Sequence, residues 1–237
     1  MQKEFSVKNC VVLFSGGIDS TTALYWARSR YDRVSALSFD YGQRHRVELT
    51  MARRLTRRLR IPHNIIKVDL RQVGGSALTD RRVALPRFRS ADDIDAAVPS
   101  SYVPFRNGIF LSLAAAWAET KAVPDIVCGF NIIDSPNYPD TRRPFVKAME
   151  RAVRLGTAAG ARGLRLRILA PFLRLTKSAI IRKGLSLGAD YSYAISCYGG
   201  KEAPCGKCSA CLLRGRAWRE AGARDHLLER LGKEGQR

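Results

Sequence analysis

The sequence has no long apolar run and is poor in acidic residues. No stretch approaches the ~20 consecutive apolar residues of a membrane-spanning helix, and no apolar N-terminal segment resembles a secretory signal. We therefore expect a soluble, cytoplasmic protein with no membrane partner. Aspartate and glutamate number 21 against 41 lysines and arginines, so the formal net charge is +20. Such a charge favours anionic ligands and raises nucleic acid as a candidate partner.

The basic residues are spread along the chain, and their densest run, MARRLTRRLR at 51–60, has the pattern of an amphipathic helix. Its arginines recur at helical spacing, which leaves the apolar residues around them free to face inward. The arginines are Arg53, Arg54, Arg57 and Arg58, and the apolar residues are Leu49, Met51, Ala52, Leu55 and Leu59. No aromatic interleaving or RNA-binding motif accompanies the run. We expect a solvated helix face and no stable nucleic-acid complex.

The order of the predicted elements indicates an α/β fold, because short β-rich runs alternate with longer helical patterns. Strands are predicted at 10–14, 34–39, 64–70, 125–130 and 165–171, and helices at 19–30, 45–60, 107–121, 143–156 and 176–187. This alternation predicts a Rossmann-like, doubly wound parallel sheet with helices on both faces. Prolines and charges interrupt it at 79–108, which we interpret as a long, partly irregular excursion. Long loops of this kind are often functional lids.

A glycine-rich loop, LFSGGIDSTTA at 13–23, directly follows the first predicted strand. Ligands of doubly wound sheets lie beyond the carboxyl ends of the strands. Gly16 and Gly17 allow close approach of the backbone, while Ser15, Ser20, Thr21 and the first amides of the following helix offer donors to phosphate oxygens. The loop lacks the lysine of a Walker A motif and the third glycine of a dinucleotide fingerprint. The loop predicts a phosphate cradle; a glycine turn with a serine-rich helix cap is the simpler alternative.

Four cysteines gather near the end of the sequence. Cys205, Cys208 and Cys211 are three residues apart, and Cys197 lies eight residues upstream of the first. Four thiolates suit tetrahedral zinc and close its coordination sphere, which predicts one structural zinc ion. An iron–sulfur cluster and disulfides are the alternatives. We place an α/β domain at 1–190 and this cysteine segment at 191–237, whereas Cys10 and Cys128 fall in strand patterns and are expected in the core.

The loop SGGIDS resembles the PP-loop of the ATP pyrophosphatase superfamily. Four further stretches occur in order: FDYGQRHRVEL, YVPFRNGIFLSLAAAWAE, GFNIIDSPNYPDTRRPF and PFLRLTKSAIIRKGLSLGADYSYAISCYGG. Together with the PP-loop and the cysteines, they are similar to the QueC family of 7-cyano-7-deazaguanine synthases over about residues 10–222.

This resemblance implies an ATP-dependent carbon–nitrogen ligase. Its substrates would be 7-carboxy-7-deazaguanine, ammonia and ATP. ATP would adenylate the carboxylate, ammonia would displace AMP to give an amide, and a second activation of the amide oxygen would leave the nitrile. A carboxylate oxygen is a poor leaving group, and incorporation into a phosphate ester removes that barrier. The product would serve 7-deazapurine biosynthesis of the queuosine or archaeosine type.

The resemblance also implies roles for particular residues. The ATP cradle would be Phe14, Ser15, Gly16, Gly17, Ile18, Asp19, Ser20, Thr21, Thr22, Ala23 and Leu24, with Asp19 near Mg²⁺ and the phosphates. Catalytic residues would be Asp19, Ser20, Arg106, Asp140 and Lys177. Substrate contacts would be Gln43, Arg44, His45, Asn107, Asp134 and Tyr138. His45 and Lys177 could equally be ordinary residues at helix starts, and a plain turn is the alternative for residues 134–140. In the loop that follows the fourth strand, Pro136 and Asn137 replace the usual serine and glycine of the family.

Two other functions compete with this interpretation. The arginine-rich run and the thiols also suit a PP-loop enzyme that modifies tRNA or another macromolecule. The altered loop at Pro136 and Asn137 also suits a repurposed QueC-like protein without the synthase activity. For the assembly we expect a homodimer, paired through exposed apolar surface in LLRGRAWREAG at 212–222.

Overall fold

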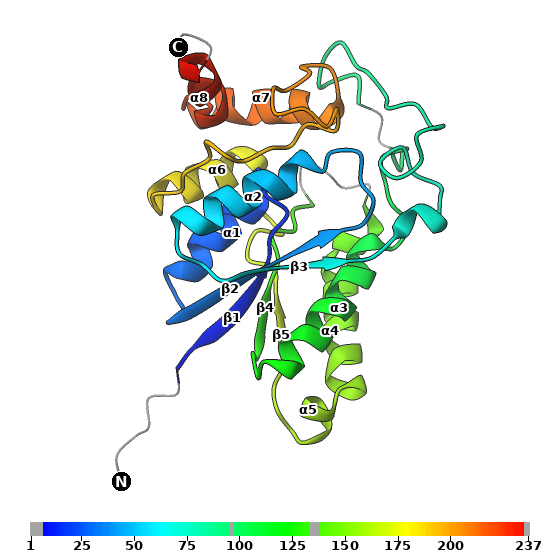
Figure 1. Ribbon diagram of the computed structural model, residues 1–237, viewed down its shortest axis with the longest axis vertical. Coiled ribbons are helices and arrows are strands. Elements are labelled where there is room, and N and C mark those ends of the chain that lie inside the picture. Colours follow the sequence, from blue (N-terminus) through cyan, green and yellow to red (C-terminus); the bar gives the residue numbers. More distant parts are fainter. Residues whose placement is uncertain (1–6, 95–96, 133–137, 235–237) are drawn as a thin grey trace.

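The computed structural model describes residues 7–94, 97–132 and 138–234. Its centre is a parallel sheet of five strands in the order β3-β2-β1-β4-β5 (Figure 1). The strands are β1 (Asn9–Leu13), β2 (Arg33–Asp40), β3 (His63–Lys67), β4 (Asp125–Val127) and β5 (Arg167–Leu169). Because every pair is parallel, the carboxyl ends of all five strands lie at one edge of the sheet.

Helices cover both faces of this sheet. One face carries α1 (Ile18–Arg28), α2 (Val47–Arg58) and α6 (Lys177–Ser186), and the other carries α3 (Arg106–Thr120) and α4 (Arg143–Gly156) (Figure 1). Side chains of β1 alternate between two cores: Cys10 and Val12 pack with α1 and α2, whereas Val11 packs with α3 and α4. This period of two follows from the pleat of the strand. The predicted doubly wound fold is confirmed.

The predicted strands and helices all occur, and α4 has the predicted bounds. The largest differences are at β3 and β4, which end at Lys67 and Val127 instead of residues 70 and 130. The described part of the predicted excursion contains turns but no helix or strand between residues 79 and 105. Short elements also form: α5 (Ala158–Ala161) and the 3-10 helices η1 (Leu70–Gln72) and η2 (Pro139–Thr141).

Two helices near the C-terminus were not among those predicted: α7 (Ser209–Ala221) and α8 (His226–Glu234). They lie at the same end of the molecule as the cysteine loop and the excursion (Figure 1). The expectation of exposed apolar surface at 212–222 is wrong for Trp218, the largest apolar side chain of that stretch. Trp218 is only 3% exposed, since its ring packs edge-on against Tyr191 with centroids 5.4 Å apart.

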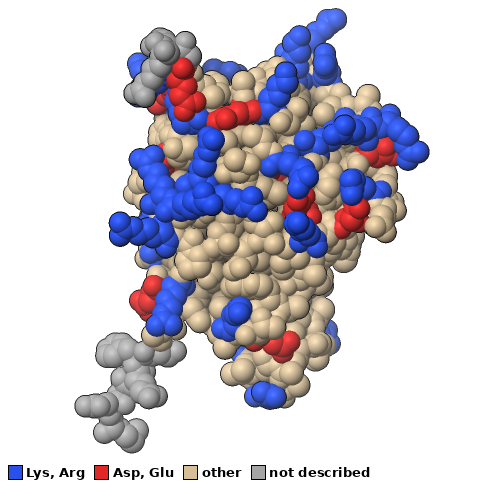
Figure 2. Space-filling model, in the orientation of Figure 1, with Lys and Arg blue, Asp and Glu red and all other residues tan. Residues whose placement is uncertain are grey.

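The arginine-rich helix α2 has the predicted amphipathic form. Its four arginines are exposed, while Leu49, Met51, Ala52 and Leu55 are buried. Two of the arginines form ion pairs, Arg54 with Glu202 and Arg58 with Asp190. Figure 2 shows lysines and arginines in several separate groups over one face of the molecule, interspersed with acidic residues. Among the described residues no helix is long and apolar enough to cross a membrane.

Candidate active site

A cleft of about 570 Å³ opens at the carboxyl ends of the strands. The adjacent strands β1 and β4 lie where the strand order reverses, which is the position at which open α/β sheets bind ligands. The segment after β1 contributes Ser15, Gly17, Asp19 and Ser20 to the walls, and the segment after β4 contributes Cys128–Asn131.

The turn of the glycine-rich loop needs glycine at residue 16. Gly16 has φ +81°, and a Cβ there would lie 2.9 Å from the carbonyl oxygen of Glu48. The Gly16 carbonyl accepts a hydrogen bond of 2.9 Å from the backbone N–H of Ile195. The Ser15 and Ser20 hydroxyls are 3.1 Å apart, and Ser20 also donates to the Gly17 carbonyl. The loop therefore presents two hydroxyls and the first amides of α1 to the cleft.

An acidic and a basic side chain from two helices meet in the cleft. Lys177, the first residue of α6, donates to Oδ2 of Asp19 at 2.7 Å. Oδ1 of Asp19 is buried and has no hydrogen-bond partner among the described residues. The chain after β4 passes against this turn, because a Cβ on Gly129 would lie 2.7 Å from the Asp19 carbonyl oxygen. A carboxylate with one unpartnered oxygen beside a lysine is suited to phosphate and cation chemistry.

Aromatic rings form another wall of the cleft. Phe39 and Phe110 stack with centroids 4.1 Å apart, and Tyr41 meets Phe110 edge-on at 5.4 Å. The guanidinium of Arg106 lies over the Tyr41 ring and donates to its hydroxyl at 3.3 Å. Burial raises the pKa of Tyr41 to about 12 although Arg106 opposes this shift, so Tyr41 is a neutral hydroxyl. A planar, conjugated ligand suits such a surface.

The start of α3 is fixed by a carboxylate from outside the helix. Oδ2 of Asp140 accepts the Asn107 N–H at 3.0 Å, and Asp140 is 3% exposed. The preceding residue, Phe105, has φ +51°, a left-handed conformation that is strained for a residue with a side chain. The Tyr138 hydroxyl lies 3.2 Å from that of Ser101. This arrangement places Arg106, Asn107 and Tyr138 in the walls of one cleft.

The predicted substrate contacts separate into two groups. His45, Asn107 and Tyr138 line the cleft. Gln43 is bonded to the backbone of Phe39 and Tyr41 and to Glu48. Arg44 donates to the carbonyls of Asp80 and Val83 and so holds the start of the excursion. Neither Gln43 nor Arg44 is among the residues that line the cleft, and Asp134, like Pro136 and Asn137, lies outside the described residues.

The predicted ATP cradle also divides. Its first half faces the cleft, with Phe14, Ser15, Gly17, Ile18, Asp19 and Ser20 in the walls. The second half turns into the core with the helix: Ala23 and Leu24 are fully buried, and the Thr22 hydroxyl lies 2.6 Å from that of Tyr191.

Sequence reasoning missed most of the aromatic wall and the residues that α7 contributes to the cleft. Tyr41 and Tyr198 stand inside two of the stretches that carry the family resemblance, and this position is the signal that could have identified them. Arg214 also lines the cleft, one helical turn after Cys211. Phe88, from the excursion, is another wall residue, and its N–H donates to the Lys207 carbonyl between two cysteines.

The four predicted metal ligands converge. The sulfur atoms of Cys197, Cys205, Cys208 and Cys211 all lie within 4.8 Å of one another. The Cys197 sulfur accepts backbone N–H bonds of 3.3 Å from Gly199 and Cys205. Hydrogen bonds from the Cys208 and Cys211 thiols lower the pKa of Cys197. The cluster could hold one metal ion.

The sheet order, the loop after β1 and the cleft at the switch point define a protein of the PP-loop ATP pyrophosphatase fold. A solved 4-thiouridine synthetase in complex with RNA and ATP is similar in fold, with a TM-score of 0.50 and 18% identity. The similarity covers 91% of this chain and 50% of that chain, so this chain spans about half of the synthetase.

Sequence comparison narrows the class. The family model of the queuosine biosynthesis protein QueC matches residues 9–222, and the chain belongs to this family. A 7-cyano-7-deazaguanine synthase from Anaeromyxobacter sp. (strain Fw109-5) is 49% identical over 93% of this chain and 96% of its own length. The enzyme of the same name from Kineococcus radiotolerans is 48% identical over 92% of this chain and 96% of its own.

Proposed function

We propose that this chain is an ATP-dependent carbon–nitrogen ligase that converts 7-carboxy-7-deazaguanine and ammonia to 7-cyano-7-deazaguanine. The observation that carries the proposal is one cleft that is lined both by the glycine-rich loop after β1 and by stacked aromatic rings. The chain belongs to the QueC family over residues 9–222, and relatives that are 48–49% identical are named 7-cyano-7-deazaguanine synthase, which supports this reaction. The aromatic wall suits the flat deazaguanine, and the loop suits the ATP phosphates.

The phosphate end of the cleft would bind and activate ATP. Ser15, Ser20 and the amides of the loop donate to phosphate oxygens, and Lys177 adds positive charge from the start of α6. This charge stabilises the transition state in which the substrate oxygen displaces pyrophosphate. Lys177 now donates to Asp19 at 2.7 Å. When Lys177 turns toward the phosphates of bound ATP, the Asp19 carboxylate becomes free to bind another cation.

Magnesium fits Asp19. Its Oδ1 is buried without a partner among the described residues, and an unpaired buried carboxylate oxygen is costly unless a ligand satisfies it. Mg²⁺ is commonly held by one or two carboxylates together with substrate phosphates. Bound there, the ion would neutralise phosphate charge.

The aromatic end of the cleft would hold the deazaguanine and its carboxylate. Arg106 stays charged: burial opposes its charge, but the neighbouring Tyr41, Tyr198 and Asp140 raise its pKa above the ordinary value. The guanidinium is thus a fixed cation for the carboxylate that is to be adenylated. Asp140 assists because its carboxylate accepts the backbone N–H of Asn107 and so holds the start of α3. His45, Asn107 and Tyr138 would contact the substrate from the same cleft, with Gln43, Arg44 and Asp134 as further candidates.

Exclusion of water protects the acyl-adenylate during its reaction with ammonia. The excursion contributes Pro86, Phe88 and Val98 to the cleft, and Arg44 and Lys207 anchor it at two places. It forms a lid over the site. The same closed site would serve both activation steps, since carboxylate and amide oxygen require the same attack on ATP.

The four cysteines would bind one structural zinc ion. Four sulfurs at ~2.3 Å from one tetrahedral ion are about 3.8 Å apart. The Cys205 and Cys211 sulfurs are 4.0 Å apart, and all four lie within 4.8 Å. A four-iron cluster holds its thiolates farther apart, because each sulfur binds a different iron. Zinc bound by four protein ligands supplies folding free energy and has no open position for substrate.

The remaining assignments follow from this function. The small-molecule substrates need no stable nucleic-acid complex, and we place the enzyme in the cytoplasm as a homodimer. Light scattering with and without tRNA at physiological salt tests the homodimer and the absence of a stable nucleic-acid complex. Limited proteolysis tests the division into a domain at 1–190 and a segment at 191–237, because a cut near residue 190 would release two bodies only if each is compact.

The reaction itself is tested by mass spectrometry. The purified protein is incubated with ATP, Mg²⁺, ammonium and 7-carboxy-7-deazaguanine, and metal content is measured on the same sample. We expect the nitrile, AMP and one zinc per chain. Bound ATP without AMP or nitrile would contradict the synthase assignment and favour a repurposed scaffold. Absorbance near 400 nm with iron in the sample would contradict zinc.

A further inference from the structure

The phosphate-binding loop is held from outside the sheet by residues 194–196. Ile195 donates its backbone N–H to the Gly16 carbonyl at 2.9 Å. In a trans peptide the C=O of Gly16 and the N–H of Gly17 point in opposite directions. The Ile195 bond therefore turns the Gly17 N–H to the other side, where it meets Ser15 Oγ at 3.3 Å in the wall of the cleft. A Cβ on Gly17 would also lie 3.6 Å from the Ile195 carbonyl oxygen.

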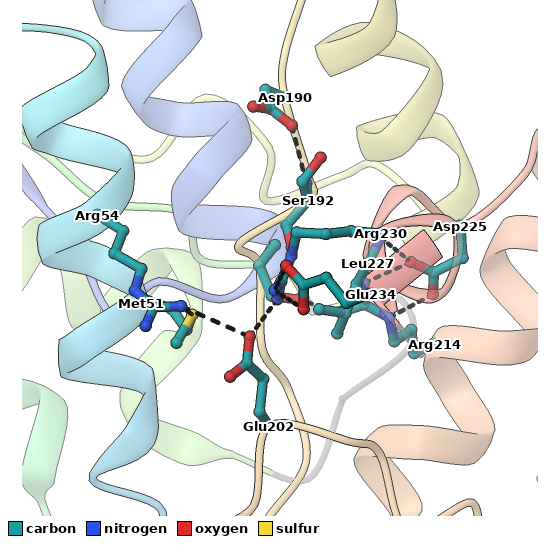
Figure 3. A network of polar contacts seen from close by, with 11 residues as sticks. Met51, Arg54, Asp190, Ser192, Glu202, Arg214, Asp225, Leu227, Arg230 and Glu234 are labelled. Carbon is teal, nitrogen blue, oxygen red and sulfur yellow. Dashed lines mark hydrogen bonds and ion pairs between the residues drawn. The ribbon is translucent and has the colours of Figure 1, made fainter. Parts of the chain in front are cut away.

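A buried arginine of α7 fixes this segment. Nη1 of Arg214 donates to the Ala194 carbonyl at 2.6 Å and reaches Ser196 Oγ at 3.5 Å. Its Nε and Nη2 donate to the two carboxylate oxygens of Asp225, at 2.5 and 2.7 Å (Figure 3). The two side chains are only 4% and 8% exposed. The planar guanidinium is thus satisfied on both edges by groups from different parts of the chain.

Asp225 is itself immobilised. Its Oδ1 accepts the Leu227 N–H at 3.0 Å, at the start of α8, and Leu227 is fully buried against Met51 and Ile195. The fork of Arg214 thus joins α7 and α8 to the two neighbours of Ile195, through the backbone carbonyl of Ala194 and the side-chain hydroxyl of Ser196. Lysine cannot replace this fork, because a single ammonium cannot reach both the carboxylate and the Ala194 carbonyl in the same geometry.

We propose that Arg214 is a positioning residue for ATP. Through Ala194 and Ile195 it sets the orientation of the Gly16–Gly17 peptide, and Asp225 holds its guanidinium in place. The proposal rests on the proposed function in that the loop binds ATP phosphates. The proposal goes beyond that function because it assigns part of the ATP affinity to α7 and α8, near the C-terminus.

A second arginine provides a matched control. Arg230 of α8 donates its Nε to the carbonyl of Ser192 at 2.8 Å, two residues before the segment 194–196, and forms ion pairs with Glu202 and Glu234 (Figure 3). Its side chain is 12% exposed. Arg230 thus anchors the chain three residues before Ile195, and it is not among the residues that line the cleft. Substitution of Arg230 therefore removes a similar set of guanidinium contacts and leaves the contacts of Ala194 and Ile195 beside Gly16 in place.

The test compares the ATP dissociation constants of the wild type, Arg214→Lys, Asp225→Asn and Arg230→Lys by calorimetry, below the melting temperature of each variant. We expect about tenfold weaker ATP binding for Arg214→Lys and Asp225→Asn, a loss of about 1.4 kcal/mol, because the Gly16–Gly17 peptide is no longer held in its orientation. Arg230→Lys should stay within about twofold of the wild type. In steady state, KM for ATP should rise in the two former variants while KM for ammonium stays unchanged.

Asp225→Asn retains the shape of the side chain and decides the question if Arg214→Lys does not fold. Unchanged ATP affinity in the folded variants would overturn the proposal, as would an equal loss in Arg230→Lys, which would indicate general destabilisation. A wild type that binds ATP but forms no nitrile would refute the proposed function alone. The ATP affinities of the variants would still decide the role of Arg214.

Discussion

The sheet end and the C-terminal end of the molecule are built differently. The loop after β1 emerges from a sheet whose two faces carry large apolar cores, and its shape is set by glycine geometry and backbone bonds. The segment from residue 191 onward has smaller clusters, such as Met51 with Ile195 and Leu227, and relies on converging thiols and buried ion pairs. The sheet end therefore depends on apolar burial, whereas the C-terminal end depends on a buried ion pair and, as we propose, on a metal ion held by the four thiols.

This comparison predicts that substitutions at the sheet end can remove chemistry without removing the fold. Asp19→Ala should lower formation of AMP and nitrile about a thousandfold, because the carboxylate no longer organises cations at the phosphates. Its side chain belongs to the cleft and not to the apolar cores. Product analysis by mass spectrometry and a melting curve on the same sample provide the measurement. Turnover within tenfold of the wild type would refute the assigned role.

The C-terminal end should respond in the opposite way. Cys208→Ser should lose the metal and several kcal/mol of stability, since binding free energy of a structural zinc site is folding free energy. Metal analysis and chemical unfolding measure both effects. Cys10→Ala is the matched control, because Cys10 is a buried cysteine in β1 outside the cluster. It should retain the metal. A metal-free Cys208→Ser protein of wild-type stability would contradict a structural role.

The same contrast explains what the sequence could predict. The phosphate loop and the cysteine cluster are local patterns: a strand followed by SGGIDS, and thiols at spacings of three. Both are found where the patterns indicate. Arg214 was missed because its partners, Ala194 and Asp225, lie 20 and 11 residues away and no local pattern pairs them.

Loop residues beside a site are the hardest to assign from sequence. Gln43 and Arg44 stand in a motif of the family, as His45 does, and yet only His45 lines the cleft. The polar side chain of Gln43 is consumed by the backbone of its own turn, where it accepts from the Tyr41 N–H and donates to the Phe39 carbonyl. Such bonds depend on the path of the backbone, which spacing alone does not specify.

At the sheet end, pH provides a finer test. His63 of β3 lies between Ser38 and Thr56, with ring nitrogens 2.7 and 3.1 Å from their hydroxyls. Burial, with a smaller effect from Arg53, lowers its pKa to about 4. In the unfolded chain His63 has a pKa of about 6.5, so the unfolded state binds the proton more tightly than the folded state. The free energy of unfolding therefore falls as pH drops from about 6.5 to about 4.

The expected loss is about 1–2 kcal/mol, less than the full shift would give, because the ring is partly in solvent. Urea unfolding of the wild type and His63→Gln at several pH values measures it. Both proteins contain the cysteine site, so the difference between their free energies of unfolding is free of any acid sensitivity of that site. If that difference is constant between pH 4 and 7, His63 is not the cause of the loss of stability at low pH.

The smallest predicted effect lies where the two ends join. The Tyr191 hydroxyl, at the start of the C-terminal segment, lies 2.6 Å from that of Thr22 in α1. Tyr191→Phe should cost about 1 kcal/mol, because Thr22 keeps its bond to the Ile18 carbonyl. A double-mutant cycle with Thr22→Val, measured by chemical unfolding, isolates the coupling between the hydroxyls. Coupling of at least about 0.5 kcal/mol is expected if the two ends unfold together. Coupling near zero, with loss of the metal before the sheet unfolds, would show that the C-terminal segment opens on its own, as its dependence on ionised groups allows.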